Sequence, residues 1–74
     1  MPYDYSKLIG RIVELFQTRK NFATTMGMSV SALSNKLHGA TSFSQGEIFR
    51  AIDILRIKPE EIQDYFFTQK VMKT

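Results

Sequence analysis

The sequence predicts an all-α domain of five short helices. Apolar residues recur at three- and four-residue spacing in five separate stretches, which is the period of a helix with one buried face. Glycine, serine, threonine or proline stands between these stretches, at positions where helices begin and end. No stretch alternates apolar and polar residues for long enough to indicate a strand. At 74 residues, the chain is expected to form a single domain over 1–74.

The predicted helices span about 5–17, 19–26, 30–38, 45–56 and 59–70. Asp4 is a suitable N-cap for the first helix, as are Thr18 for the second and Ser29 for the third. Ser44 and Glu47 have the spacing of a capping box, which is the strongest helix-start signal in the chain.

The second and third predicted helices are separated only by residues 27–29, which is the spacing of a helix-turn-helix. Gly27 can adopt the positive φ that such a turn requires. Ala23 is small where the two helices approach each other, and Met28 can turn inward. Leu33 is placed to pack back against the second helix. These features occur in register, and together they predict a helix-turn-helix.

The same segment resembles the helix-turn-helix of the phage Cro and repressor (Xre-type) family. The residues that carry the resemblance are Phe22-Ala23-Thr24-Thr25-Met26-Gly27-Met28-Ser29, then Leu33, then Leu37-His38-Gly39. The resemblance extends over most of the chain and looks closest to the short Cro-like proteins of temperate phages. It implies a compact five-helix, lambda-repressor-like domain. It also implies binding of double-stranded operator DNA by a homodimer, with the third helix in the major groove.

By this resemblance, the start and outer face of the third helix meet base edges. The candidate base-contacting residues are Ser29, Val30, Ser31, Ser34 and Asn35. Asn35 can pair with adenine, the serines can bond to several bases, and Val30 can touch a thymine methyl group. The alternative is that the polar residues among them are simply solvated.

Phosphate contacts are expected from the second helix and from the loop after the third. The candidates are Arg19, Lys20, Lys36, Thr41 and Ser42. The net charge is +3, and the excess of positive charge lies in the first 39 residues, although a solvated surface explains such a charge equally well. His38 stands near a helix end, where a capping or phosphate-binding role is expected rather than a catalytic one.

The fifth predicted helix begins at Pro59, which suits the first helical position. It has more apolar residues than one buried stripe can accommodate, so part of it is expected to be exposed at a protein interface. The candidate interface residues are Tyr65, Phe67, Val71 and Met72. The alternative is a wide core-facing surface followed by a frayed tail.

Two functions therefore compete. The first is a sequence-specific DNA-binding regulator of the Cro and repressor type, acting in a lysis–lysogeny switch. The alternative is an antirepressor of the same fold, which captures a phage repressor protein. The third helix favours this alternative, because the helix lacks the long glutamine and arginine side chains that most often read bases.

Composition argues against other classes. The chain has no cysteine, one histidine, no glycine-rich phosphate loop and no metal-ligand spacing, so neither an enzyme, a cofactor, a metal nor a small-molecule substrate is expected. No apolar run approaches a membrane span and no signal peptide is evident, so a location in the cytoplasm of a bacterial host cell is expected.

Overall fold

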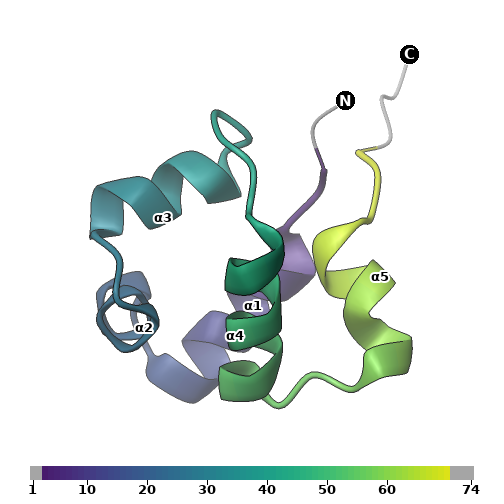
Figure 1. Ribbon diagram of the computed structural model, residues 1–74, viewed down its shortest axis with the longest axis horizontal. Coiled ribbons are helices and arrows are strands. Elements are labelled where there is room, and N and C mark those ends of the chain that lie inside the picture. Colours follow the sequence, from purple (N-terminus) through teal and green to yellow (C-terminus); the bar gives the residue numbers. More distant parts are fainter. Residues whose placement is uncertain (1–2, 71–74) are drawn as a thin grey trace.

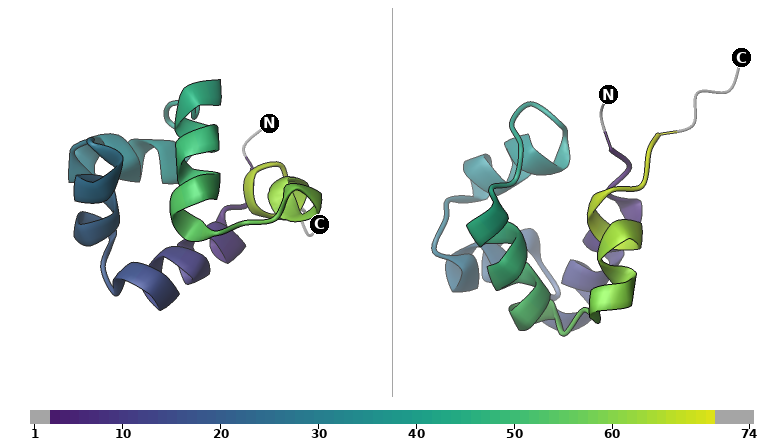
Figure 2. Two further views of the ribbon diagram at one scale, coloured as in Figure 1. Left: turned by 60° about the horizontal axis from the view of Figure 1, so that its bottom comes forward. Right: turned by 45° about the vertical axis from the view of Figure 1, so that its right-hand side comes forward.

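The computed structural model describes residues 3–70 and confirms the all-α fold (Figure 1). Its elements are α1 (Ser6–Phe16), α2 (Arg19–Met26), α3 (Val30–Leu37), α4 (Gln45–Leu55), a 3-10 helix (Pro59–Glu61) and α5 (Ile62–Phe66). Within the described residues there is no strand, and an isolated antiparallel bridge joins Tyr3 and Gln69. Helix α4 stands in the middle, with α2 and α3 on one side of it and α5 on the other (Figures 1 and 2).

The core forms where the apolar stripes of the helices meet. Leu8 and Ile12 lie one turn apart on α1 and are 1% and 0% exposed. The same cluster contains apolar residues from all five α-helices and from the segments next to α1 and α4. Its members are Tyr5, Leu8, Ile12, Phe22, Ala23, Met26, Leu33, Leu37, Ala51, Leu55, Ile57, Tyr65 and Phe66. Burial of each large apolar side chain contributes about 1.5–3 kcal/mol, so these contacts fix the mutual positions of the helices.

The start of α1 differs from the prediction by one residue. The helix begins at Ser6, so Tyr5 and not Asp4 is its N-cap residue. Asp4 still satisfies a free donor at this end, because its Oδ1 accepts the Ser6 N–H at 2.8 Å. Hydrogen bonds from Ser6 lower the pKa of the Asp4 carboxyl, since they favour its ionised form.

The fifth helix is shorter than predicted. It was expected over 59–70, but α5 ends at Phe66. Beyond it the Thr68 hydroxyl donates to the Asp64 carbonyl oxygen at 2.7 Å, which closes the end of the helix. The Thr68 carbonyl oxygen then accepts the Asp4 N–H at 2.7 Å. The chain therefore leaves the helix because its backbone pairs with the N-terminal segment, a contact between residues far apart in the sequence.

Candidate functional site

A tight turn over 27–29 joins α2 to α3, and the two helices cross steeply, with α2 seen nearly end-on in Figure 1. Gly27 has a φ of 77°, in the left-handed region that favours glycine. Its N–H donates to the Thr24 carbonyl oxygen at 3.1 Å, and the Met28 N–H donates to the Ala23 carbonyl oxygen at 3.0 Å. These bonds end α2 and reverse the chain as a helix-turn-helix requires.

Side-chain caps fix where both helices of this motif begin. Thr18 Oγ1 accepts the Asn21 N–H at 3.1 Å, and Ser29 Oγ accepts the Ala32 N–H at 3.0 Å. The predicted packing residues contact the core. Ala23 and Leu33 are buried in it, and Met28 is half-buried against it. The motif is thus held by local caps and by the core behind it.

The outer face of α3 consists of small, uncharged residues. Four of the predicted base-contacting residues are exposed, namely Ser29, Val30, Ser31 and Asn35. The fifth, Ser34, is half-buried. Val30 is 42% exposed at the first position of the helix. Five predicted positions therefore share one region, but that region carries no charge and no long hydrogen-bonding side chain.

The other predicted polar contacts lie on two separate segments. Lys20 is exposed and Arg19 is half-buried in the first turn of α2. Thr41 and Ser42 are exposed in the loop between α3 and α4, and His38 is exposed at the end of α3. Phosphate binding by these residues stays a prediction.

The structure gives Lys36 two contacts within the chain. Its Nζ lies 3.1 Å from Glu47 Oε1 in an ion pair and donates to the Ser42 carbonyl oxygen at 3.0 Å. Its side chain is only 15% exposed. Lys36 therefore joins the end of α3 to the start of α4, and a phosphate would have to compete with Glu47 for it.

Glu47 gives this junction a pH dependence. The Ser44 N–H donates to Glu47 Oε1 at 2.8 Å, and this bond, helped by Lys36, holds the pKa of Glu47 below its usual value of 4.5. Because this pKa is depressed in the folded state, the stabilisation is present above pH 4.5 and is lost as the pH falls through the folded pKa.

We expect Glu47→Gln to lower the free energy of unfolding at neutral pH by about 0.3–1 kcal/mol, because the amide loses the charge that favours the start of α4 and pairs with Lys36. The variant should also lose part of the fall in stability below pH 4.5. Urea unfolding followed by circular dichroism at several pH values measures both effects. Glu14→Gln is the matched control, since Glu14 forms an exposed pair on α1. Equal behaviour of the two variants would contradict the assignment.

Arg50 of α4 belongs to the helix-turn-helix as well, and sequence reasoning missed it. Its Nη1 donates to the Met26 carbonyl oxygen at 2.8 Å, at the last residue of α2. A cation at the C-terminal end of a helix complements the helix dipole. The two residues are 24 positions apart, so no local pattern announces the contact.

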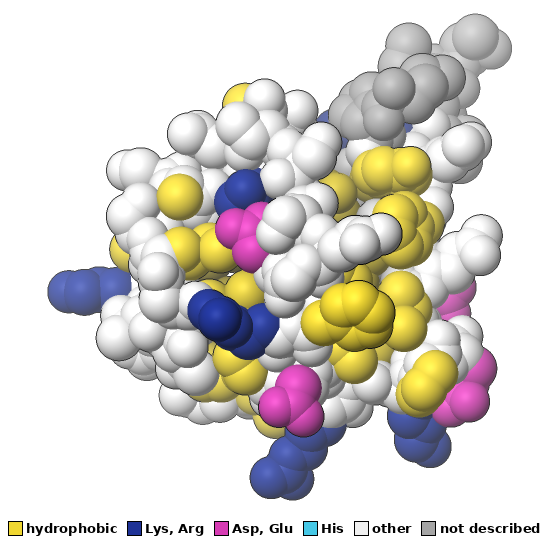
Figure 3. Space-filling model, viewed as in Figure 1, with side chains coloured by type: hydrophobic (Ala, Val, Ile, Leu, Met, Phe, Trp, Pro, Cys, Tyr) yellow, Lys and Arg dark blue, Asp and Glu magenta, His cyan; other side chains and the backbone are white. Residues whose placement is uncertain are grey.

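Helices α4 and α5 present an exposed apolar surface (Figure 3). Phe49 is 71% exposed, the largest value among the exposed large apolar residues, and Phe67 is 41% exposed. A groove of about 320 Å³ runs between the two helices. We call its apolar lining the α4–α5 apolar surface, and it consists of Ile48, Phe49, Ile52, Ile62 and Phe67.

The predicted protein interface needs correction at one position. Tyr65 is 9% exposed, because α5 turns it towards α1, where the Lys7 Nζ lies 4.9 Å from the centre of its ring. Phe67 does lie on the exposed surface, and its ring meets that of Tyr3 edge-on at 5.6 Å. Val71 and Met72 lie outside the described residues. The most exposed of the large apolar side chains is Phe49 of α4, which was not among the predicted interface residues.

Among residues 3–70, no three histidine, cysteine or acidic residues lie close enough to hold a metal ion. None of the helices in that range is long and apolar enough to span a membrane.

Comparisons with known proteins place this fold. No curated protein matches the chain. Among solved structures, it is similar to the modulator of repression (MOR) of the temperate bacteriophage TP901-1 from Lactococcus lactis, known from a solution structure. The two have 42% sequence identity and a TM-score of 0.80, and the match covers 97% of each chain. Residues 1–69 match the family described as "Protein of unknown function (DUF739)", and the chain therefore belongs to the DUF739 family.

Proposed function

We propose that this protein binds a transcriptional repressor and modulates its action. The observation that carries the proposal is the similarity to the phage modulator of repression, at 42% identity over 97% of both chains. At such identity and coverage, the two chains share a fold. The proposal favours the antirepressor hypothesis over operator binding by this chain alone.

The proposed binding surface is the α4–α5 apolar surface. Exposed apolar groups that adjoin a groove are typical of protein interaction sites, because partner binding removes them from water. Aromatic residues are enriched among those that dominate binding energy. Phe49 has most of its side chain in solvent and lies at the edge of this groove.

The chemistry of α3 also supports a protein partner. Its exposed outer residues are short and uncharged. Its one cation, Lys36, is held by Glu47 and the Ser42 carbonyl oxygen. Strong base readout usually depends on long side chains that bond bidentately. Among these residues only Asn35 can bond bidentately, and its side chain is short.

Isothermal titration calorimetry of the purified chain against its cognate repressor, meaning the repressor encoded by the same genome, tests the proposal. We expect a stoichiometric complex with a negative heat-capacity change, the sign of apolar burial. The affinity should depend only weakly on salt, because the contact is largely apolar. Absence of binding to the folded repressor would overturn the proposal.

Replacing Phe49 by alanine should weaken repressor binding by about 10- to 100-fold, the loss typical of a central aromatic residue. The melting temperature should change little, because Phe49 is 71% exposed in the free chain. Val13→Ala is the matched control, since Val13 is an exposed apolar residue of α1, 48% exposed, outside the groove. Equal affinity of the Phe49 and Val13 variants would remove the α4–α5 apolar surface from the interface.

DNA binding is the second candidate function. The observation in its favour is an intact helix-turn-helix that exposes Ser31 and Asn35 on α3 and Lys20 at the start of α2. Titration of an early-promoter fragment and a random duplex at two salt concentrations tests it. Preference for the promoter, with affinity that falls steeply with salt, would support this candidate. Weak binding without preference would leave repressor binding as the better explanation.

A further inference from the structure

Arg50 joins α4 to the helix-turn-helix. It follows Phe49 in α4, and its Nη1 donates to the Met26 carbonyl oxygen at 2.8 Å. It also lies close to the turn, since a Cβ built on Gly27 would be 3.7 Å from the same Nη1. One side of the guanidinium is thus fixed against the end of α2.

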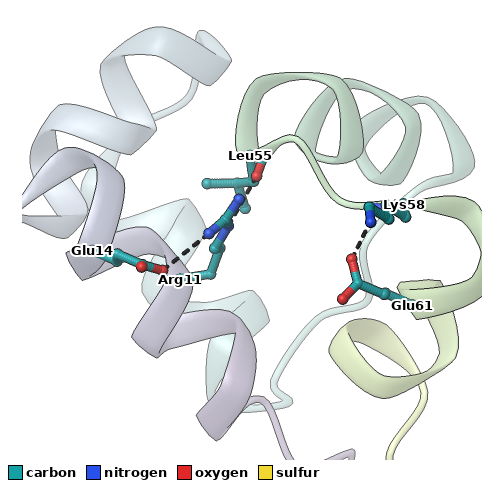
Figure 4. Close-up of polar contacts among 5 residues, drawn as sticks. All are labelled: Arg11, Glu14, Leu55, Lys58 and Glu61. Carbon is teal, nitrogen blue, oxygen red and sulfur yellow. Dashed lines mark hydrogen bonds and ion pairs between the residues drawn. The ribbon is translucent and has the colours of Figure 1, made fainter.

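Arg11 provides an internal comparison, because it binds the end of a helix in a similar way (Figure 4). Its Nε donates to the Leu55 carbonyl oxygen at 3.0 Å, at the end of α4. Its Nη1 also pairs with Glu14 Oε1 at 3.0 Å, so a carboxylate balances the charge. Arg11 therefore bonds to the end of a helix and also has a carboxylate partner within the chain.

Arg50 differs from Arg11 because it forms no ion pair within the described residues. The ion pairs within residues 3–70 are Lys7–Asp64, Arg11–Glu14 and Lys36–Glu47, and none includes Arg50. A guanidinium has five N–H donors in a rigid fork suited to a carboxylate. Because the bond to Met26 already orients Arg50, little further conformational freedom is lost when an anion binds.

We propose that Arg50 is a specificity-determining residue that binds an aspartate or glutamate of the repressor when Phe49, exposed on the same helix, makes an apolar contact with it. This inference rests on the proposed function, and it assigns the chemistry of the partner: an apolar segment flanked by a carboxylate. A protein carboxylate is preferred to a DNA phosphate because Arg50 and the phenyl ring of Phe49 are both exposed on α4. A protein partner can bury that ring together with the ion pair, whereas a DNA backbone cannot.

The first test compares repressor affinities of Arg50→Gln, Arg50→Lys and the matched control Arg56→Gln. Arg56 is an exposed cation at the end of the same helix. Arg50→Gln should weaken binding at least 10-fold, mostly through faster dissociation. Arg50→Lys should lose less, because it keeps the charge but not the fork. Circular dichroism checks that each variant is folded. Equal losses for Arg50→Gln and Arg56→Gln would overturn the proposal, because net charge would then explain both.

The second test leaves this chain unchanged, so it stands even if the Arg50 variants fold poorly. Each exposed aspartate or glutamate of the repressor is replaced in turn by its amide. One replacement should weaken binding to the wild-type chain at least 10-fold. Where Arg50→Gln folds, that replacement should cause little further loss with this variant, because the two changes remove the same pair.

The outcomes separate this inference from the proposed function. If the wild-type chain does not bind the repressor, the proposed function fails. If it binds and no repressor carboxylate matters, only the role of Arg50 fails. If Arg50→Gln instead weakens DNA binding and flattens its salt dependence while repressor binding is unchanged, Arg50 contacts a phosphate and the proposal is overturned.

Discussion

Replacing Leu33 by alanine should lower the free energy of unfolding by about 3 kcal/mol, the typical cost of a large cavity in a core. Leu33 is 0% exposed and packs in the centre of the cluster that joins α3 to the other helices. A domain of this size has only about 5–10 kcal/mol of stability in total, so the loss should be visible as a large fall in melting temperature. Thermal and urea unfolding followed by circular dichroism measure it.

Leu15→Ala is the matched control for this prediction. Leu15 lies on α1 and is 39% exposed, so the same change removes far less buried surface. We expect its effect to stay below about 1 kcal/mol. Similar losses for the two variants would show that α3 does not pack on the core through Leu33.

Replacing Gly27 by valine should cost about 3 kcal/mol, because a β-branched residue is strained at positive φ. Gly27 has a φ of 77°. For the Cβ itself, the cost comes from the backbone and not from a clash, since the nearest atom to an added Cβ is Arg50 Nη1 at 3.7 Å, an ordinary contact. Gly27→Ala should therefore cost less, about 1 kcal/mol.

Gly10→Ala separates this strain from the general effect of adding a methyl group. Gly10 lies within α1, and a Cβ there would meet nothing within 4 Å. Alanine favours the helix, so this variant should gain about 0.5–1 kcal/mol in unfolding free energy. Unchanged unfolding of Gly27→Val would mean that the turn between α2 and α3 does not need the left-handed conformation.

The sequence predicts most of the helices because their signals are local. Thr18, Ser29 and Ser44 each cap the helix that follows, through a bond three residues along the chain. The left-handed turn at Gly27 also depends on its own residue type. Apolar spacing likewise identifies core residues such as Leu33, because a helix repeats every 3.6 residues.

The rest depends on contacts between distant residues. Helix α5 ends early because Asp4 pairs with Thr68, and Lys36 is held by Glu47 from the next helix. Arg50 reaches Met26 across 24 positions. The exposure of Phe49 was missed for a related reason: periodicity marks an apolar residue but does not show whether another helix covers it.

The most direct test of repressor modulation is release of the repressor from its operator. A fluorescently labelled operator is saturated with the cognate repressor, and the purified chain is added while anisotropy is recorded at constant salt. Stoichiometric addition should remove the repressor and lower the anisotropy to that of free DNA, and Phe49→Ala should require about 10- to 100-fold more protein. An unchanged repressor–operator complex, together with direct and promoter-selective DNA binding by this chain, would contradict the account and establish a DNA-binding regulator.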